Sequence, residues 1–168
     1  MSKMNSAVNW RAIIGFELCW FLLVYFQQLM FWPVLAYWLY GMWRLASNRA
    51  RVAVLLTALT GIAVDSVLVA TGIMSFAQLS WMPLWFVLLW LLFALVVIEV
   101  MSAFLTRPLL AFVLGAVGGP LSYWGGAALS GGVLQFPMGM LSYGVLIMVW
   151  GLLAIIFGYS RRAYVTQV

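Results

Sequence analysis

The sequence predicts an all-α polytopic membrane protein, a bundle of six transmembrane helices that forms one integral membrane domain over residues 1–168. Composition is the first observation that predicts a membrane protein, because 67% of the residues are hydrophobic and only 7% are charged. A soluble domain carries about a quarter charged residues. The hydrophobic residues also gather in runs close to the roughly 20 residues that cross a bilayer. Little sequence is left for an extramembrane catalytic or nucleotide-binding domain.

Six hydrophobic runs follow one another with short connections, which predicts that sequential helices pack as antiparallel neighbours. The runs cover residues 10–27, 30–45, 52–72, 82–105, 108–125 and 137–159. The second run is the shortest. Two uncharged connections, 73–81 and the glycine-rich 126–136, suit segments that are partly re-entrant on the outer side.

The basic residues give the orientation, because they gather on the cytoplasmic side of membrane proteins. They are Lys3, Arg11, Arg44, Arg49, Arg51, Arg107, Arg161 and Arg162. Six helices with both termini in the cytoplasm place all of them inside, whereas five or seven would carry the C-terminal pair across. The net charge of +5 therefore predicts contact with anionic membrane lipids and no nucleic-acid partner.

The residue types that are missing exclude several kinds of chemistry. The chain has no histidine, which excludes histidine-ligated haem, the usual zinc sites and a Ser-His triad. Its one cysteine, Cys19, forms no internal disulfide and reads as a small buried hydrophobe. We expect no metal and no cofactor.

Three acidic residues, Glu17, Asp65 and Glu99, all lie within predicted spans. A carboxylate at membrane depth costs about 2.5–3.5 kcal/mol on insertion scales, so each needs a local reason. Counting from the nearest arginine at about 1.5 Å per residue, Glu17 and Glu99 lie roughly 9 and 12 Å from the cytoplasmic side. Asp65 lies roughly 21 Å in, within the outer half.

The fifth helix carries a proline at the depth of Asp65. Proline lacks an N–H and clashes with the preceding turn, so we expect the helix to be broken at Gly118–Pro120. Asp65 and Ser66 would meet this break and bond to hydroxyls beyond it. The candidate ligand site or polar clamp comprises Asp65, Ser66, Gly119, Pro120, Ser122 and Tyr123. Both interpretations stay open: a buried clamp that fixes the fold, or a ligand or ion site of the kind that broken helices line in transporters.

A second candidate site lies toward the cytoplasmic side and comprises Glu17, Glu99 and Ser102. It is either a polar pocket with a shared proton, in which Arg11 or Arg107 reaches a carboxylate, or a site that binds a proton or a cation.

Three segments carry a family resemblance: Gly61-Ile-Ala-Val-Asp-Ser66, Pro83-Leu-Trp85, and Gly115-Ala-Val-Gly-Gly-Pro-Leu-Ser-Tyr-Trp-Gly-Gly126. Together they resemble a family of small bacterial inner-membrane proteins known only as a domain of unknown function. The resemblance implies an inner-membrane location but no activity. Family members tend to carry Asn, His or Ser near the position of Glu99, where this chain departs. Their genes often lie near those for fatty-acid modification, an associational pointer to lipid metabolism.

Three functions are compatible with these features. The first is a carrier or substrate-binding membrane subunit for a small molecule or ion. The alternative is a non-enzymatic accessory or scaffold protein linked to membrane lipid or fatty-acid modification, which acts on a membrane or peripheral protein partner. The third is an intramembrane enzyme, although no nucleophile–base set is visible.

Overall fold

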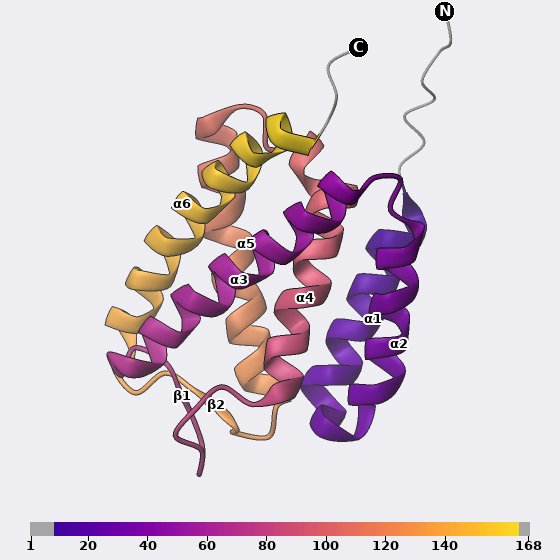
Figure 1. Cartoon of the computed structure of the whole chain (residues 1–168). Helices are drawn as coiled ribbons and strands as arrows, with labels where there is room; N and C mark the ends of the chain where they lie inside the picture. The colour runs from indigo at the N-terminus through magenta and orange to yellow at the C-terminus, as the bar shows by residue number, and fades with distance from the viewer. Residues whose placement is uncertain (1–8, 165–168) are drawn as a thin grey trace, which may run out of the picture.

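The computed structural model describes residues 9–164, which form an all-α bundle with one minimal sheet. Lys3, one of the basic residues used above, lies outside the described residues. In chain order the elements are α1 (Trp10–Phe26), η1 (Gln27–Met30), α2 (Phe31–Arg44), α3 (Asn48–Ala70), β1 (Ser75–Phe76), α4 (Leu84–Glu99), η2 (Met101–Ala103), α5 (Pro108–Leu129), β2 (Leu134–Gln135) and α6 (Met140–Tyr164). Figure 1 shows the start of α1 and the end of α6 at the same end of the bundle.

Four helical segments of the described chain are long and apolar enough to cross a membrane. They are Trp10–Arg44, Asn48–Ala70, Pro108–Leu129 and Met140–Tyr164. The apolar helix α4 is shorter, at 16 residues, which corresponds to about 24 Å against a hydrocarbon core of about 30 Å. The structure therefore agrees with a multi-pass membrane protein.

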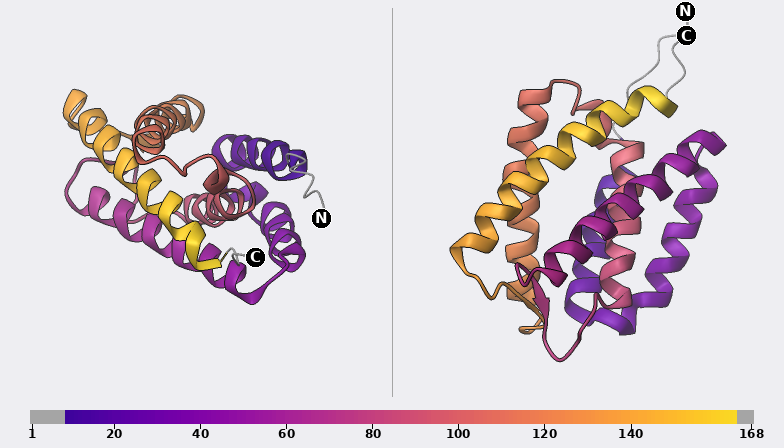
Figure 2. Two further views of the ribbon diagram at one scale, coloured as in Figure 1. Left: turned by 90° about the horizontal axis from the view of Figure 1, so that it is seen from above. Right: turned by 60° about the vertical axis from the view of Figure 1, so that its left-hand side comes forward.

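The segment Trp10–Arg44 reverses direction in its middle, so α1 and α2 lie side by side and antiparallel (Figures 1 and 2). Gln27, at the reversal, has a positive φ of 50°, which ends the regular helix. Across the hairpin, the Tyr37 hydroxyl donates to the Arg11 carbonyl over 3.1 Å. A Cβ at Gly15 would lie 1.9 Å from the same hydroxyl, so glycine allows this close approach.

Helix α4 is the centre of the bundle and contacts α1, α2 and α3. Ten of its 16 residues are buried, which explains why this short helix is apolar on every side. The expected span over 82–105 is too long, because α4 ends at Glu99 and the chain continues as the 3₁₀ turn η2. Val100 leaves the helical region with φ −138° and ψ −60°, and Gly158 of α6 packs against the backbone of Leu105.

Helices α5 and α6 form the closest pair, as the small residues of α5 predict. A Cβ at Gly115 would lie 2.3 Å from the Trp150 carbonyl oxygen, and one at Gly119 would lie 2.1 Å from the Trp150 ring. Gly151 opposes Phe112 in the same way, at 2.5 Å. The long helices α3 and α6 cross the bundle obliquely (Figure 2).

The connections at the end opposite the chain termini are folded onto the bundle. Strands β1 and β2 pair antiparallel, with Ser75 opposite Gln135 and Phe76 opposite Leu134. Both Phe76 and Leu134 are buried. The Ser142 hydroxyl donates to the Ile73 carbonyl over 2.6 Å. These contacts hold the two connections against the bundle as a short sheet, and their partly re-entrant position in a membrane stays a prediction.

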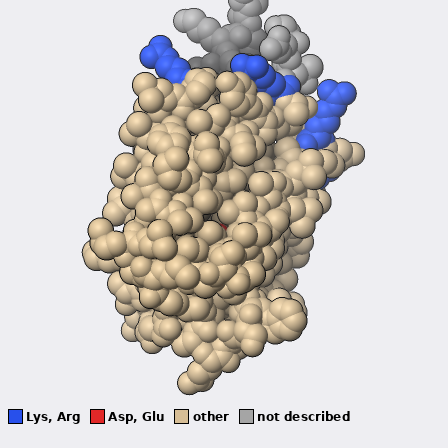
Figure 3. All heavy atoms as spheres, turned by 90° about the vertical axis from the view of Figure 1, so that its left-hand side faces the viewer, with Lys and Arg blue, Asp and Glu red and all other residues tan. Residues whose placement is uncertain are grey.

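Arginines gather at the other end of the molecule. Arg51 donates to the carbonyls of Met42 and Leu45, each over 3.1 Å, and so closes the end of α2. Ser47 caps α3 by accepting from the Ala50 N–H over 3.1 Å. Figure 3 shows the blue side chains of basic residues of one face gathered at this end. The described charges thus divide the bundle into one basic end and one uncharged end.

Candidate functional site

Asp65 lies in the interior of the bundle, where three helices meet. It is 1% exposed and accepts two hydrogen bonds on the same oxygen, Oδ2. One comes from the Trp90 indole Nε1–H of α4 over 2.6 Å, and the other from the Tyr123 hydroxyl of α5. The contact expected between Asp65 and Tyr123 is therefore present.

The glycine one turn before Asp65 makes this arrangement possible. A Cβ at Gly61 would lie 2.1 Å from the Trp90 ring, so only glycine lets the indole lie flat against α3. On its other side Trp90 stacks on Trp150 of α6, with ring centroids 5.3 Å apart and planes 10° apart. The cluster of Asp65, Trp90, Tyr123 and Trp150, which we call the Asp65 cluster, ties α3, α4, α5 and α6 together.

Helix α5 is continuous from Pro108 to Leu129, with Pro120 inside it. The expected break at Gly118–Pro120 is wrong. A proline removes one backbone hydrogen bond and crowds one carbonyl, which bends a helix without requiring it to end. Gly115 and Gly119, before the proline, pack against Trp150 of α6. Tyr123, after the proline, packs against the same ring with centroids 5.7 Å apart, so both halves of α5 contact α6. Gly119 and Pro120 are buried, as expected of this site, but they act by packing.

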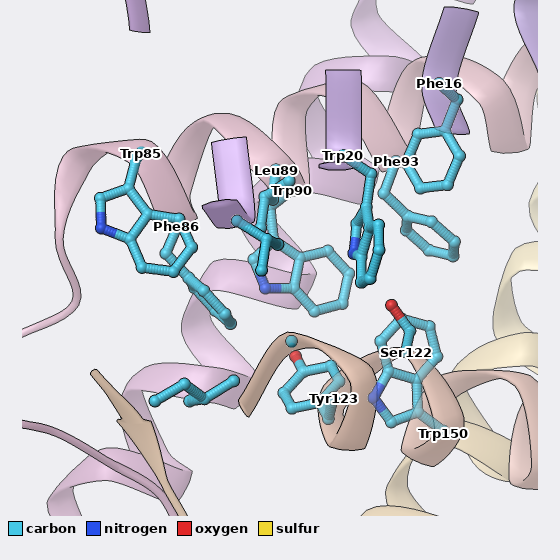
Figure 4. Close-up of a pocket in the computed structure, with 13 residues that line it drawn as sticks. Phe16, Trp20, Trp85, Phe86, Leu89, Trp90, Phe93, Ser122, Tyr123 and Trp150 are labelled. Carbon is cyan, nitrogen blue, oxygen red and sulfur yellow. The ribbon is translucent and has the colours of Figure 1, made fainter. Parts of the chain in front are cut away.

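Two of the expected hydroxyls do not reach Asp65. Ser66 is exposed and donates to the Ile62 carbonyl of its own helix over 2.7 Å. Ser122 faces a cavity on the other side of Tyr123 (Figure 4). The structure therefore brings Asp65 to Tyr123 alone among the hydroxyls named from the sequence. Trp90 supplies the second donor.

Sequence reasoning missed Trp90 and Trp150 as members of this cluster. The tryptophans near helix ends are explained by interfacial belts, but Trp90 and Trp150 lie within α4 and α6. A tryptophan buried at mid-helix must pack its ring and find an acceptor for its N–H. That combination, beside a carboxylate at membrane depth, is the signal that points to the Trp90–Asp65 bond.

A cavity lies beside the Asp65 cluster, between α1 and α5, with α4 and α6 forming its back wall. It consists of two adjoining hollows of about 540 Å³ and about 50 Å³, which share Phe16, Trp20, Phe93, Ser122 and Trp150 as lining residues. Figure 4 shows Trp20 and Phe93 facing Ser122 and Trp150 across the smaller hollow. We call this space the α1–α5 cavity. Its combined size is within the range of about 300–1,000 Å³ typical of ligand pockets.

The rim of the larger hollow is formed by exposed residues of α1 and α5, among them Glu17, Leu114, Gly118 and Leu121. Trp90 and Tyr123 line the smaller hollow, whereas Asp65 lies behind them and does not line it. The carboxylate thus positions two side chains of the cavity wall and is closed off from the cavity itself.

The three residues of the second candidate site, Glu17, Glu99 and Ser102, lie apart and have different surroundings. Glu99 pairs with Arg11 of α1 and accepts from Asn9 Nδ2 over 3.4 Å. Ser102 is buried and accepts from the Tyr164 hydroxyl over 2.7 Å. Glu17 is exposed on the wall of the α1–α5 cavity. The structure does not unite them in one polar pocket.

The ion pair of Glu99 is partly shielded, with side-chain exposures of 28% for Arg11 and 9% for Glu99. Arginine reaching back to a carboxylate is one of the two pairings expected from the sequence. The second carboxylate oxygen, Oε2, is buried without a partner among the described residues. This half-satisfied pair ties the start of α1 to the end of α4. No group of three or more His, Cys, Asp and Glu side chains that could hold a metal ion occurs within residues 9–164.

Comparison with known proteins places the chain in a family. The chain belongs to the family described as "Protein of unknown function (DUF2878)", which matches residues 9–156. This confirms the resemblance to an uncharacterised family. No curated protein and no solved structure matches the chain.

Proposed function

We propose that the protein is a six-span bacterial inner-membrane protein with both ends of the chain in the cytoplasm, and that it binds a small amphipathic molecule in the α1–α5 cavity as a carrier or substrate-binding membrane protein. The bend at Gln27 supports counting α1 and α2 as separate spans. The gathering of arginines at one end supports the orientation, because the inner side is the basic one.

Labelling of single cysteines tests the orientation. Cys19 is the one cysteine of the chain, so Cys19→Ser gives a background without thiols. Gln78, two residues after β1, and Asn48, the first residue of α3, are both exposed, and Figure 1 shows β1 and the start of α3 at opposite ends of the bundle. Gln78→Cys should react with an impermeant maleimide added to intact cells, and Asn48→Cys only after lysis. The reverse pattern, or equal reaction of both, would exclude the proposed topology.

The observation that carries the binding function is the α1–α5 cavity. Its wall is aromatic and apolar, with the Ser122 hydroxyl and the Glu17 carboxylate as polar groups, the composition that suits a ligand with an apolar body and one polar end. Its rim consists of exposed residues on helices that we place in the membrane, so the ligand reaches the cavity sideways from the bilayer.

The Asp65 cluster has a positioning role in this proposal. Rings that stack on a ligand must be held at fixed angles, and an indole on a helix surface has several rotamers. The bond from Trp90 to Asp65 fixes one of these rotamers, and the bond from Tyr123 fixes the adjoining part of α5. Asp65 therefore serves the cavity without touching its contents.

Photolabelling tests the binding function. Full-length protein in lipid nanodiscs is irradiated with a neutral diazirine-bearing fatty alcohol, and adducts are mapped by mass spectrometry. We expect adducts on Trp20, Phe93 or Ser122, reduced about tenfold by Gly118→Leu. That leucine meets no atom within 4 Å of its Cβ yet extends into the cavity.

Gly144→Leu is the matched control, because Gly144 has equally open surroundings and does not line the cavity. It should leave the adducts unchanged. Adducts confined to outward-facing residues such as Trp32, insensitive to Gly118→Leu, would refute the binding function and favour the accessory role.

A further inference from the structure

The three carboxylates of the bundle differ in whether the protein supplies a partner. Asp65 accepts from two donors, and Glu99 pairs with Arg11. Glu17 has no hydrogen-bond or ion-pair partner among residues 9–164. It is the eighth of the 17 residues of α1, so it lies at mid-helix. A carboxylate at such a depth is costly unless something compensates its charge.

The position of Glu17 suggests where that compensation comes from. Its side chain lines the larger hollow of the α1–α5 cavity, beside Phe16 and Trp20 of the same helix. Phe93 of α4 and Trp150 of α6 line the same hollow. The faces of aromatic rings carry partial negative charge and attract cations, most strongly where water is excluded. Carboxylate and rings therefore favour the same sign of charge in the same space.

The wall also indicates the kind of cation. Glu17 and Ser122 are the residues of the larger hollow that carry a side-chain oxygen. Calcium and magnesium ions need about six oxygen ligands or a retained water shell, which an aromatic wall does not provide. A large organic cation is weakly hydrated, fills an apolar volume and needs one counter-ion.

We propose that the α1–α5 cavity takes a lipophilic organic cation, with Glu17 as its counter-ion and the rings of Trp20, Phe93 and Trp150 as its contact surface. This inference rests on the proposed binding function and specifies its ligand class. A positively charged amphiphile that dissolves in the bilayer meets both conditions of the site, sideways access and a carboxylate that has no partner among the described residues.

Two probes of the same shape and opposite charge test the proposal: tetraphenylphosphonium, a cation, and tetraphenylborate, an anion. Equilibrium binding of each to the full-length protein in nanodiscs is measured against empty nanodiscs, which corrects for partition into lipid. We expect saturable binding of the cation, at least about tenfold tighter than that of the anion.

Variants assign that preference to one residue. Glu17→Gln should abolish the preference for the cation and lower its affinity at least about tenfold, whereas Glu17→Asp should keep the preference. Glu99→Gln makes the same change at a carboxylate outside the cavity and should bind the cation like the unmodified protein. Thermal unfolding of each variant confirms that it is folded.

Equal binding of cation and anion, or unchanged cation binding in Glu17→Gln, would overturn this inference. The fatty-alcohol adducts test binding in the cavity separately from the preference for a cation. Adducts in the cavity without a charge preference would keep the binding function and refute the cation, whereas absence of cavity adducts together with absence of saturable cation binding would refute both.

Discussion

Asp65 and Glu17 are carboxylates in the same bundle, and the protein treats them in opposite ways. Asp65 is closed off, 1% exposed, with an indole and a phenol bonded to one oxygen. Glu17 faces the α1–α5 cavity without a partner among the described residues. The two side chains lie on opposite sides of one aromatic wall, the first behind it and the second in front.

Pairing separates a structural from a functional carboxylate inside a helical bundle. A buried carboxylate with neutral donors on several helices has its solvation replaced by the fold, so removing it harms the fold. A carboxylate whose solvation nothing replaces lowers stability where it stands, and a ligand can compensate that cost. Glu99 is intermediate, because Arg11 pairs with one oxygen while Oε2 stays unpaired.

The sharpest test of the comparison removes Asp65. Asp65→Ala leaves the Trp90 N–H and the Tyr123 hydroxyl buried without an acceptor, and each such group costs about 1–3 kcal/mol. Interhelical bonds in membranes fall toward the low end, so we expect a loss of about 3 kcal/mol in the free energy of unfolding, measured by denaturant titration in micelles. Asp65→Asn keeps an acceptor oxygen and should lower the free energy of unfolding by less than Asp65→Ala does.

Ser66→Ala is the neighbouring control, because Ser66 bonds only within its own helix and should change stability by less than about 0.5 kcal/mol. Equal effects of Asp65→Ala and Ser66→Ala would mean that the Asp65 cluster does not hold the bundle together.

The second largest loss in unfolding free energy is expected at Gly61, the glycine against which Trp90 packs. Gly61→Ala places a methyl group 2.1 Å from the indole ring, which forces the ring away from α3 and against Trp150, a strain of about 2 kcal/mol. Gly144→Ala, at an open helical position, should gain up to about 1 kcal/mol from helix propensity. The same denaturant titration compares the two. A stabilising Gly61→Ala would show that Trp90 is not held where the structure places it.

A smaller loss is expected at the Glu99 pair. Arg11→Gln leaves Glu99 without its cation. Because the pair is only partly shielded, we expect the free energy of unfolding to fall by about 1 kcal/mol. The double variant Arg11→Gln/Glu99→Gln should recover part of this loss in unfolding free energy, since no unpaired charge remains. Strict additivity of the two changes in unfolding free energy would indicate that the side chains do not interact.

The smallest effect on stability is expected at Glu17. Glu17→Gln removes a charge that no described residue pairs, so the free energy of unfolding without ligand should rise or stay within about 0.5 kcal/mol. Thermal unfolding in nanodiscs measures this directly. A loss above about 1 kcal/mol would reveal a structural partner of Glu17 and remove the contrast with Asp65.

Hydropathy located the helices well, because burial in lipid or protein selects the same apolar residues. The run 10–27 became Trp10–Phe26, and 30–45 became Phe31–Arg44. The end of α4 differs from the predicted one, because Val100 leaves the helical region directly after Glu99, where the chain meets Arg11 from a distant part of the sequence. Pro120 was misread for a similar reason, because the packing of α5 on α6 holds a helix that a local rule would break.

Depth along the helices was enough to bring Asp65 and Tyr123 together, because a helix has a fixed rise per residue. It was not enough to assign Trp90, or to separate Glu17 from Glu99, because the rise gives a level in the membrane and not a direction around the helix axis. Glu17 and Glu99 share a level, yet one faces the α1–α5 cavity and the other faces Arg11.

Composition and local periodicity alone were enough to predict an apolar helical protein, the order and approximate bounds of its helices, and the gathering of basic residues at helix ends. Which carboxylate is paired, the continuity of α5 and the aromatic cavity between α1 and α5 follow from the packing of the helices. The physical reason is that pairing and cavities depend on how helices rotate and pack against one another, and hydropathy along the chain does not encode that rotation.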